Sequence, residues 1–203
     1  MKIICIGRNY IDHAKELNNP VPAQPVFFLK PETAVLRKNL PFFYPDFTSD
    51  LHYEVELVVK ISKIGKHIQE KFAYKHYEEI GLGIDFTARD LQMEQKKKGL
   101  PWEVAKAFDS SAPIGDFIPI AEIGDLNNIH LSLKKNDEIV QEGSSGDMIF
   151  SIDQIIAYVS QFVSLKIGDL IFTGTPAGVG PVMIGDRLTG YMNEREMFSF
   201  EVK

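Results

Sequence analysis

The sequence of 203 residues contains one cysteine and no long hydrophobic run. The lone Cys5 excludes an internal disulfide and, because it lies in the apolar run IICI, indicates a buried thiol in a reduced compartment. This run ends at Gly7 and Arg8 and is too short for the core of a signal peptide, and no other run is long enough to cross a bilayer. We therefore expect a cytoplasmic protein without a membrane partner.

Basic residues are also scarce relative to acidic ones, and the formal net charge is −6. Binding to nucleic-acid phosphates needs clustered Lys and Arg, so we expect no nucleic-acid partner. The one basic run, residues 96–98, precedes Gly99 at the end of a predicted helix. Cations complement the helix dipole there and glycine ends the helix, which explains the run without a polyanion.

Composition and patterning predict one domain over residues 1–203. The sequence is 44% hydrophobic and 25% charged, which is typical of globular proteins, and it has no repeats or linker-like runs. Predicted strands outnumber helices and seldom alternate with them, which favours an α+β, β-rich fold. The predicted strands cover 2–6, 25–30, 51–61, 78–86 and 197–203, and a hairpin turns at Asn136-Asp137. Helices are predicted over 9–17 and 87–99. A third predicted helix is capped by Ser151 and Gln154, and its buried stripe consists of Ile155, Ile156, Val159, Phe162 and Val163.

Two glutamates interrupt the apolar strand YEVELVV. Glu54 and Glu56 are alternate residues, so they share one face of the strand with Cα atoms about 6.6 Å apart. Carboxylates ~5 Å apart repel by about 3 kcal/mol at an effective dielectric constant of ~20. Water and salt reduce this repulsion on an open surface, where the pair would be a solvated strand face.

Asp85 is the candidate for a third oxygen ligand because it follows the run IGLGI at a predicted strand end. Three carboxylates without cysteine favour a hard cation such as Mg²⁺ or Mn²⁺ over zinc. The alternative for Asp85 is an N-terminal cap of the helix that follows.

Other polar residues could take part in chemistry. His13 and Glu16 share a face of the predicted N-terminal helix, where the carboxylate could orient the imidazole as a general base, although an exposed polar face has the same spacing. The glycine-rich turn 173–181 could contact a carboxylate or be an ordinary connection. Lys106 follows Trp102 in an apolar setting and could meet an anionic substrate or lie on the surface.

These segments occur in an order that resembles the fumarylacetoacetate hydrolase family, in particular its short branch of acylpyruvate hydrolases, fumarylpyruvate hydrolases and oxaloacetate decarboxylases. The resemblance runs along nearly the entire chain. The segments that carry it are GRNYIDHAKE (7–16), PVFFLKP (25–31), YEVELVV (53–59), DFTARDLQ (85–92), KKGLPWEVAKAFD (97–109) and IGDLIFTGTPAGVGP (167–181).

The resemblance implies a β-rich mixed roll with a short N-terminal lid helix and a homodimeric assembly. It implies that Glu54, Glu56 and Asp85 bind Mg²⁺ or Mn²⁺, with Ca²⁺ possible in crystals. It also implies that His13 and Glu16 activate water, and that the residues lining the substrate pocket are Arg8, Gln92, Lys106 and Thr175.

The implied reaction is cleavage of a carbon–carbon bond in a small 2-oxo or 2,4-dioxo acid. Water activated by His13 and Glu16 would attack the distal carbonyl of an acylpyruvate, and pyruvate would leave as an enolate stabilised by the cation and Lys106. Oxaloacetate decarboxylation passes through the same enolate without attacking water, and 2-oxo acid hydratases or isomerases are further alternatives. The alternative from another class is a non-catalytic β-rich module that binds a cation such as Ca²⁺.

Overall fold

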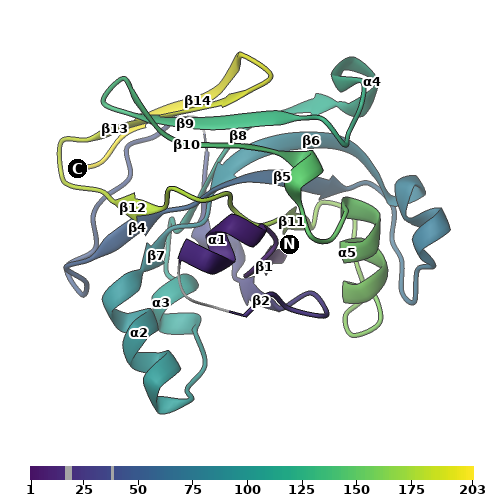
Figure 1. Cartoon of the computed structure of the whole chain (residues 1–203), viewed down its shortest axis with the longest axis horizontal. Helices are drawn as coiled ribbons and strands as arrows, with labels where there is room; N and C mark the ends of the chain where they lie inside the picture. Colours follow the sequence, from purple (N-terminus) through teal and green to yellow (C-terminus); the bar gives the residue numbers. More distant parts are fainter. Residues whose placement is uncertain (17–19, 38) are drawn as a thin grey trace.

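The computed structural model describes residues 1–16, 20–37 and 39–203, and their largest sheet has seven strands. Most neighbours are antiparallel, whereas β1 pairs with β11, and β3 with β8, in parallel. This sheet runs through the middle of the molecule (Figure 1). Its strands, in spatial order, are β2 (Phe27–Lys30), β1 (Ile3–Ile6), β11 (Leu170–Phe172), β5 (Val55–Ile61), β6 (Tyr77–Ile84), β8 (Ala112–Pro119) and β3 (Val35–Leu36).

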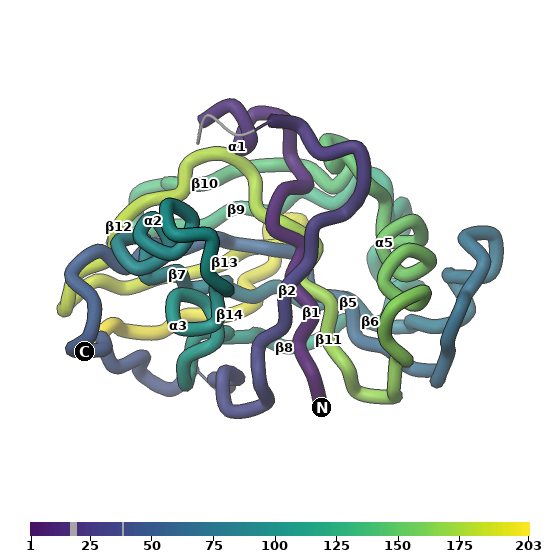
Figure 2. Tube along the Cα trace, turned by 90° about the horizontal axis from the view of Figure 1, so that it is seen from below, coloured from purple at the N-terminus to yellow at the C-terminus, as the bar shows by residue number. Residues whose placement is uncertain are grey.

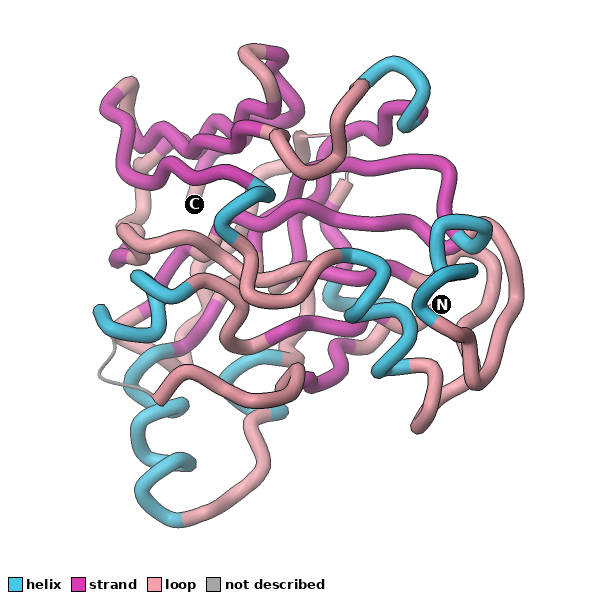
Figure 3. Tube along the Cα trace, turned by 45° about the vertical axis from the view of Figure 1, so that its right-hand side comes forward, coloured by secondary structure: helices cyan, strands magenta, loops and turns pink. Residues whose placement is uncertain are grey.

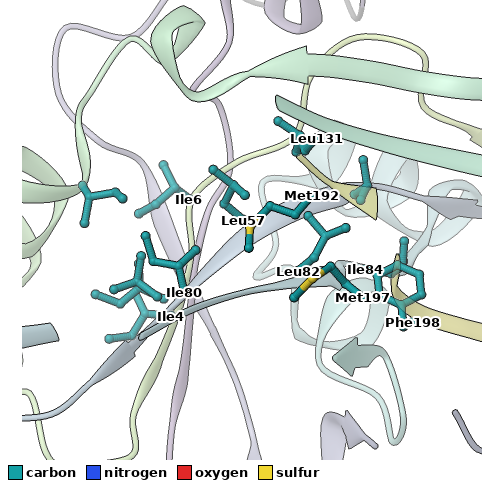
Figure 4. Packing of buried hydrophobic residues seen from close by; sticks show 14 of the residues in the cluster. Ile4, Ile6, Leu57, Ile80, Leu82, Ile84, Leu131, Met192, Met197 and Phe198 are labelled. Carbon is teal, nitrogen blue, oxygen red and sulfur yellow. The ribbon is translucent and has the colours of Figure 1, made fainter. Parts of the chain in front are cut away.

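A four-stranded sheet packs against the large sheet and encloses the core with it. Its spatial order is β10 (Glu138–Ser144), β9 (His130–Lys135), β13 (Arg187–Met192) and β14 (Arg195–Glu201). Figure 4 shows Leu57 and Leu82 of the large sheet beside Leu131 and Met192 of the smaller one, in one buried cluster. Each such side chain contributes about 1.5–3 kcal/mol by leaving water. The predicted hairpin is confirmed, since Asn136 and Asp137 join β9 to β10 with φ of 52° and 70°.

The predicted strand 51–61 is in fact two strands that belong to different sheets. β4 (Leu51–Tyr53) pairs with β7 (Thr87–Ala88) and β12 (Gly180–Pro181), whereas β5 starts at Val55. The chain changes sheet at Glu54, where the backbone N–H of Val55 donates to the side-chain Oε1 of Gln141 at 2.9 Å. A side chain from β10 therefore takes the hydrogen bond that a continuous ladder would have used.

The helices are short and lie around the sheets (Figure 3). The described residues include no helix that is long and apolar enough to cross a membrane. α1 lies beside the segment between β11 and β12 (Figure 2). The α-helices are α1 (Ile11–Glu16), α2 (Arg89–Lys98), α3 (Glu103–Lys106), α4 (Ile120–Ile123) and α5 (Ile152–Val159), and 3₁₀ turns cover Glu32–Ala34, Glu70–His76 and Ser145–Asp147.

Most predicted helix ends agree with the structure. Gly99 ends α2 with φ of 65°, and Ser151 and Gln154 form a reciprocal capping box at α5. The first helix begins at Ile11, two residues later than predicted, and its predicted end at Leu17 lies outside the described residues. The prediction for Phe162 was wrong: α5 ends at Val159, so Phe162 falls beyond the helical stripe and is 56% exposed.

The mixed, β-rich architecture confirms the predicted fold class. Its consequence for function is that β5, the end of β6 and the segment after β11 converge near α1, α2 and α3. The candidate residues come from these elements.

Candidate active site

Three carboxylates that are separated in the sequence meet in the interior. Glu54 lies between β4 and β5, Glu56 lies on β5, and Asp85 directly follows β6. One oxygen of each lies within 4.8 Å of the others, and the three residues are only 5%, 1% and 1% exposed. Pairing of β5 with β6 brings them together, since the Asp85 N–H donates to the Glu54 carbonyl at 2.8 Å. Asp85 is not the cap of α2, whose N-cap residue is Ala88.

Three buried cations surround two of these carboxylates. Arg89 Nη2 lies 2.5 Å from Glu54 Oε1, and Lys106 Nζ lies 2.8 Å from Glu54 Oε2 and 2.7 Å from Asp85 Oδ2. Lys30 Nζ lies 2.8 Å from Asp85 Oδ1. Burial alone would raise the pKa of Glu54, but Lys106 and Arg89 hold it well below its usual value. Burial alone would also lower the pKa of Lys106, which Asp85 and Glu54 instead raise, so Lys106 stays charged.

Glu56 has a different environment. It accepts a hydrogen bond from the backbone N–H of Gly174 at 2.7 Å. Burial, followed by repulsion from Asp85 and Glu54, holds the pKa of Glu56 well above its usual value. Among the described residues, Glu56 is therefore the member of the cluster without an ion pair to a basic side chain.

The donor set fits a hard divalent cation. Lys30 donates to Phe86 O, Ser111 O and Ser111 Oγ at 2.9–3.2 Å, which uses its three protons. Asp85 Oδ1 is consequently buried without a hydrogen-bond donor, although the Lys30 ammonium is near. A cation would stabilise this arrangement, in which Asp85 Oδ1 has no hydrogen-bond donor and the adjacent Glu56 has no ion pair to a basic side chain. A set of oxygen ligands alone suits Mg²⁺ or Mn²⁺.

The structure also brings His13 and Glu16 together. His13 Nδ1 lies 3.2 Å from Glu16 Oε2, and Glu16 Oε1 accepts from the backbone N–H of Gly178 at 3.1 Å. His13 is only 3% exposed, whereas Asp12 and Lys15 form an exposed pair at 3.1 Å. The helix therefore has one polar face in solvent and directs its imidazole inward. With the proton on Nδ1, the lone pair of Nε2 is left as a proton acceptor.

A narrow cleft connects His13 with the carboxylate cluster. Phe28 and Trp102 form an aromatic wall with ring centroids 5.9 Å apart and edge-to-face geometry. Lys106 Nζ lies 5.1 Å from the centroid of the Phe28 ring. The residues lining the cleft are Gly7, Arg8, His13, Phe28, Glu54, Arg89, Gln92, Lys96, Trp102 and Lys106. The sequence-predicted residues Arg8, Gln92 and Lys106 thus share one cleft.

Thr175 is tied to the same site through Gln141. Thr175 is 3% exposed and its Oγ1 accepts a hydrogen bond from Gln141 Nε2 at 2.8 Å. Gln141 Nε2 also donates to Pro176 O at 3.0 Å, while its Oε1 accepts from Val55 N. One amide therefore links the peptide between Glu54 and Glu56 to the turn after β11. Since Thr175 accepts from Gln141, its hydroxyl proton is free to be donated elsewhere.

Sequence reasoning missed Lys30, Arg89 and Gln141. Lys30 ends an apolar strand and Gln141 occupies an inward position of an alternating strand, so each is a polar residue where the pattern predicts burial. Buried polar groups need partners, which is the signal that could have identified them. Arg89 is four residues after Asp85 at the start of α2, and its partner Gln92 Oε1 lies 2.7 Å away.

Residues 2–203 match the model of the fumarylacetoacetate (FAA) hydrolase C-terminal family. The chain belongs to this family. It is therefore a member of an enzyme family, and the resemblance carried by its motifs is confirmed.

Relatives in the family are named for different activities. The chain is 46% identical to a mitochondrial oxaloacetate tautomerase of Mus musculus over 201 residues, which cover 99% of the chain and 91% of the relative. It is 45% identical to a mitochondrial oxaloacetate decarboxylase of Dictyostelium discoideum over 185 residues, covering 91% and 85%.

A solved structure gives a third relative. The fumarylpyruvate hydrolase of Pseudomonas aeruginosa, in complex with Mn²⁺ and pyruvate, superposes with a TM-score of 0.94 at 40% identity, covering 100% of this chain and 89% of that one. That relative therefore holds Mn²⁺ and pyruvate in a fold of the same shape.

Proposed function

We propose that the protein catalyses keto–enol interconversion of oxaloacetate at a divalent cation held by Glu54, Glu56 and Asp85. The observation that carries this proposal is the buried cluster of three carboxylates and three cations. Similarity to an oxaloacetate tautomerase supports the reaction, and the Mn²⁺ of the hydrolase relative supports the cofactor.

The charges of the cluster favour a dicarboxylate. Three carboxylates balance Lys30, Arg89 and Lys106, so a divalent ion would leave two positive charges. Arg8 and Lys96 add further positive charge to the cleft. Oxaloacetate, with two negative charges, would compensate more of this excess than an acylpyruvate with one carboxylate. Buried charge is costly unless it is compensated, which makes the dianion the better match.

His13 is the candidate proton carrier. Its Nε2 would take a proton from C3 of oxaloacetate, and the 2-oxo oxygen would gain a proton from water. The imidazolium would then give its proton to the hydroxide left behind, which leaves the enol and restores neutral His13 and water. Glu16 would hold the ring through Nδ1 and stabilise the imidazolium. Lys106 and the hydroxyl of Thr175 would stabilise negative charge on the substrate. A bound divalent cation would supply Lewis-acid polarisation of the 2-oxo group.

The test is the decay of enol-oxaloacetate followed by its ultraviolet absorbance, with Mg²⁺ and after chelation. We expect decay faster than in a matched Mg²⁺ buffer, and loss of that acceleration with chelator. Wild-type protein that leaves the buffer rate unchanged would overturn the proposal. If Mg²⁺ also raised the melting temperature of such an inactive protein, the cation-binding structural module would be the better interpretation.

Carbon–carbon bond cleavage is the second candidate function, because the His13–Glu16 pair is built like a water-activating dyad. Pyruvate release from acetylpyruvate and fumarylpyruvate measures hydrolysis, and release from oxaloacetate measures decarboxylation. We expect His13→Ala with Glu16→Gln to abolish acylpyruvate cleavage and to spare much of the decarboxylation. Equal loss of both activities at unchanged metal occupancy would contradict a separate role for the dyad.

A further inference from the structure

We infer that Lys96, together with Arg8, binds the second carboxylate of a dicarboxylic 2-oxo acid at the cleft. This inference rests on the proposed function and assigns its preference for a dicarboxylate to a residue. Lys96 and Arg8 both line the cleft that contains His13, Glu54 and Lys106.

The cations of the cleft fall into two groups. Arg89 and Lys106 are paired with carboxylates of the cluster at 2.5–2.8 Å. Arg8 and Lys96, in contrast, have no ion-pair partner among residues 1–16, 20–37 and 39–203. The paired group, together with Lys30, balances the carboxylate cluster, and the unpaired group is left to meet an incoming anion.

An aromatic pair separates the two lysines of the cleft. Lys106 Nζ lies over Phe28 at 5.1 Å from the ring centroid, and Lys96 Nζ lies over Trp102 at 5.3 Å. Phe28 and Trp102 contact each other edge to face. Lys106 and Lys96 are thus held on successive rings of one wall. A substrate whose 2-oxo acid end lies by Lys106 would extend along this wall toward Lys96.

The electrostatic environment of Lys96 agrees with this arrangement. Lys96 is an exposed residue of α2, but partial burial of its side chain, followed by repulsion from Arg89 and Arg8, lowers its pKa. Positive charge in this part of the cleft therefore exceeds the negative charge that compensates it. A bound carboxylate would relieve that repulsion, and a charge-assisted hydrogen bond to it would favour the dicarboxylate.

The rest of the basic run supplies matched controls. Lys98 pairs with Glu94 at 2.5 Å on the exposed side of α2. Lys97 is exposed, as Lys96 is, but it does not belong to the residues that line the cleft. The helix-end explanation of the run therefore suffices for Lys97 and Lys98, whereas Lys96 has a further contact with the cleft.

The experiment compares Lys96→Met with Lys97→Met, which make the same charge change one residue apart. Binding is measured calorimetrically with Mg²⁺ present, using 3,3-difluoro-oxaloacetate as a dicarboxylate that cannot enolise and pyruvate as a monocarboxylate. Losing one charge-assisted hydrogen bond predicts about 10-fold weaker binding of the dicarboxylate to Lys96→Met, with pyruvate binding changed less than about 2-fold. Lys97→Met should bind both as wild type does, and Lys96→Arg should retain most of the affinity.

Equal weakening of both ligands by Lys96→Met would overturn the inference, because Lys96 would then act by general charge or by supporting Trp102. Equal effects of Lys96→Met and Lys97→Met would also overturn it. Selective loss of dicarboxylate binding in a protein that does not accelerate enol decay would support the inference and contradict the proposed function, so the two failures are distinguishable.

Discussion

Glu56 and Asp169 are both buried carboxylates near neighbouring strands, but they are stabilised in opposite ways. Asp169 precedes β11 and its side chain is 2% exposed. Its Oδ1 accepts from Lys2 N at 3.0 Å, and its Oδ2 accepts from Lys166 N at 2.7 Å and from the Lys2 ammonium. Glu56 has the Gly174 N–H as its donor and faces two other carboxylates.

The pKa values of the two groups shift in opposite directions. Burial raises the pKa of Glu56, and Asp85 and Glu54 raise it further. Burial would also raise the pKa of Asp169, but hydrogen bonds from the Lys2 side chain and the backbone of Lys166 and Lys2 lower it overall. Asp169, which serves the fold, is surrounded by donors, whereas Glu56, which we propose binds a cation, accepts a hydrogen bond from a single backbone N–H. The difference is a general signal of function.

The variant that tests this difference between Glu56 and Asp169 most directly is Glu56→Gln. We expect activity on 2-oxo acids to fall by more than about 100-fold, because the variant loses one of the three proposed anionic ligands. Loss of a direct ligand should lower activity more than loss of a group that only orients a ligand. The folded pKa of Glu56 is raised, so its charged form destabilises the fold once the pH exceeds the unfolded value. In chelator, Glu56→Gln should therefore unfold in urea no more easily than wild type. An active variant, or one that is clearly less stable, would contradict the assignment.

The next effect concerns Gln141, which bonds to the backbone beside the cluster and is not among the residues that line the cleft. Gln141→Leu removes the bonds to Val55, Thr175 and Pro176, and outer-sphere partners of metal ligands typically contribute 10–100-fold. We expect kcat/KM to fall by about that factor and the apparent affinity for Mg²⁺ to weaken. The control is Glu142→Gln, which alters the exposed neighbour that pairs with His130 at 2.8 Å. Equal affinity for Mg²⁺ in wild type and Gln141→Leu would show that Gln141 does not position the ligands.

Asp169→Asn should give the converse of Glu56→Gln, with lower stability and unchanged kcat. Loss of charge-assisted hydrogen bonds predicts about 1–3 kcal/mol less free energy of unfolding at neutral pH. Because the folded pKa of Asp169 is lowered, its stabilisation is complete above the unfolded value of about 3.9 and is lost as the pH falls through the folded value. Urea unfolding at several pH values should show the difference between variant and wild type shrinking below about pH 4. A difference that is constant with pH would contradict this account.

The sequence predicts local features better than long-range ones. The Asn136-Asp137 turn and the capping box at Ser151 depend on neighbouring residues, and both occur in the structure. Glu54 and Glu56 also lie close together as predicted, although Glu54 lies between β4 and β5 and not within one continuous strand. The change of sheet at Glu54 depends on Gln141, which comes from a distant strand.

The same limit explains the missed cations. Lys30 and Arg89 belong to the site only because the folded chain places them beside Asp85 and Glu54. A period of two in hydrophobicity identifies a strand but not the sheet it joins or the charge that faces it.

Glu94 is an exposed carboxylate, in contrast to the buried Glu56 and Asp169. Changes to its ion pair are expected to have the smallest effect on the free energy of unfolding. Its pair with Lys98 spans one turn of α2 at 2.5 Å, with both side chains more than half exposed. Exposed pairs of this kind contribute about 0.3–0.5 kcal/mol. Lys98→Ala should therefore lower the free energy of unfolding by at most about 0.5 kcal/mol more than Lys97→Ala, which shares the helix-dipole contribution but not the ion pair. A double-mutant cycle with Glu94→Ala measures this coupling. Coupling well above 1 kcal/mol would mean that α2 is held by its surface charges, and that the cleft residues it carries depend on them.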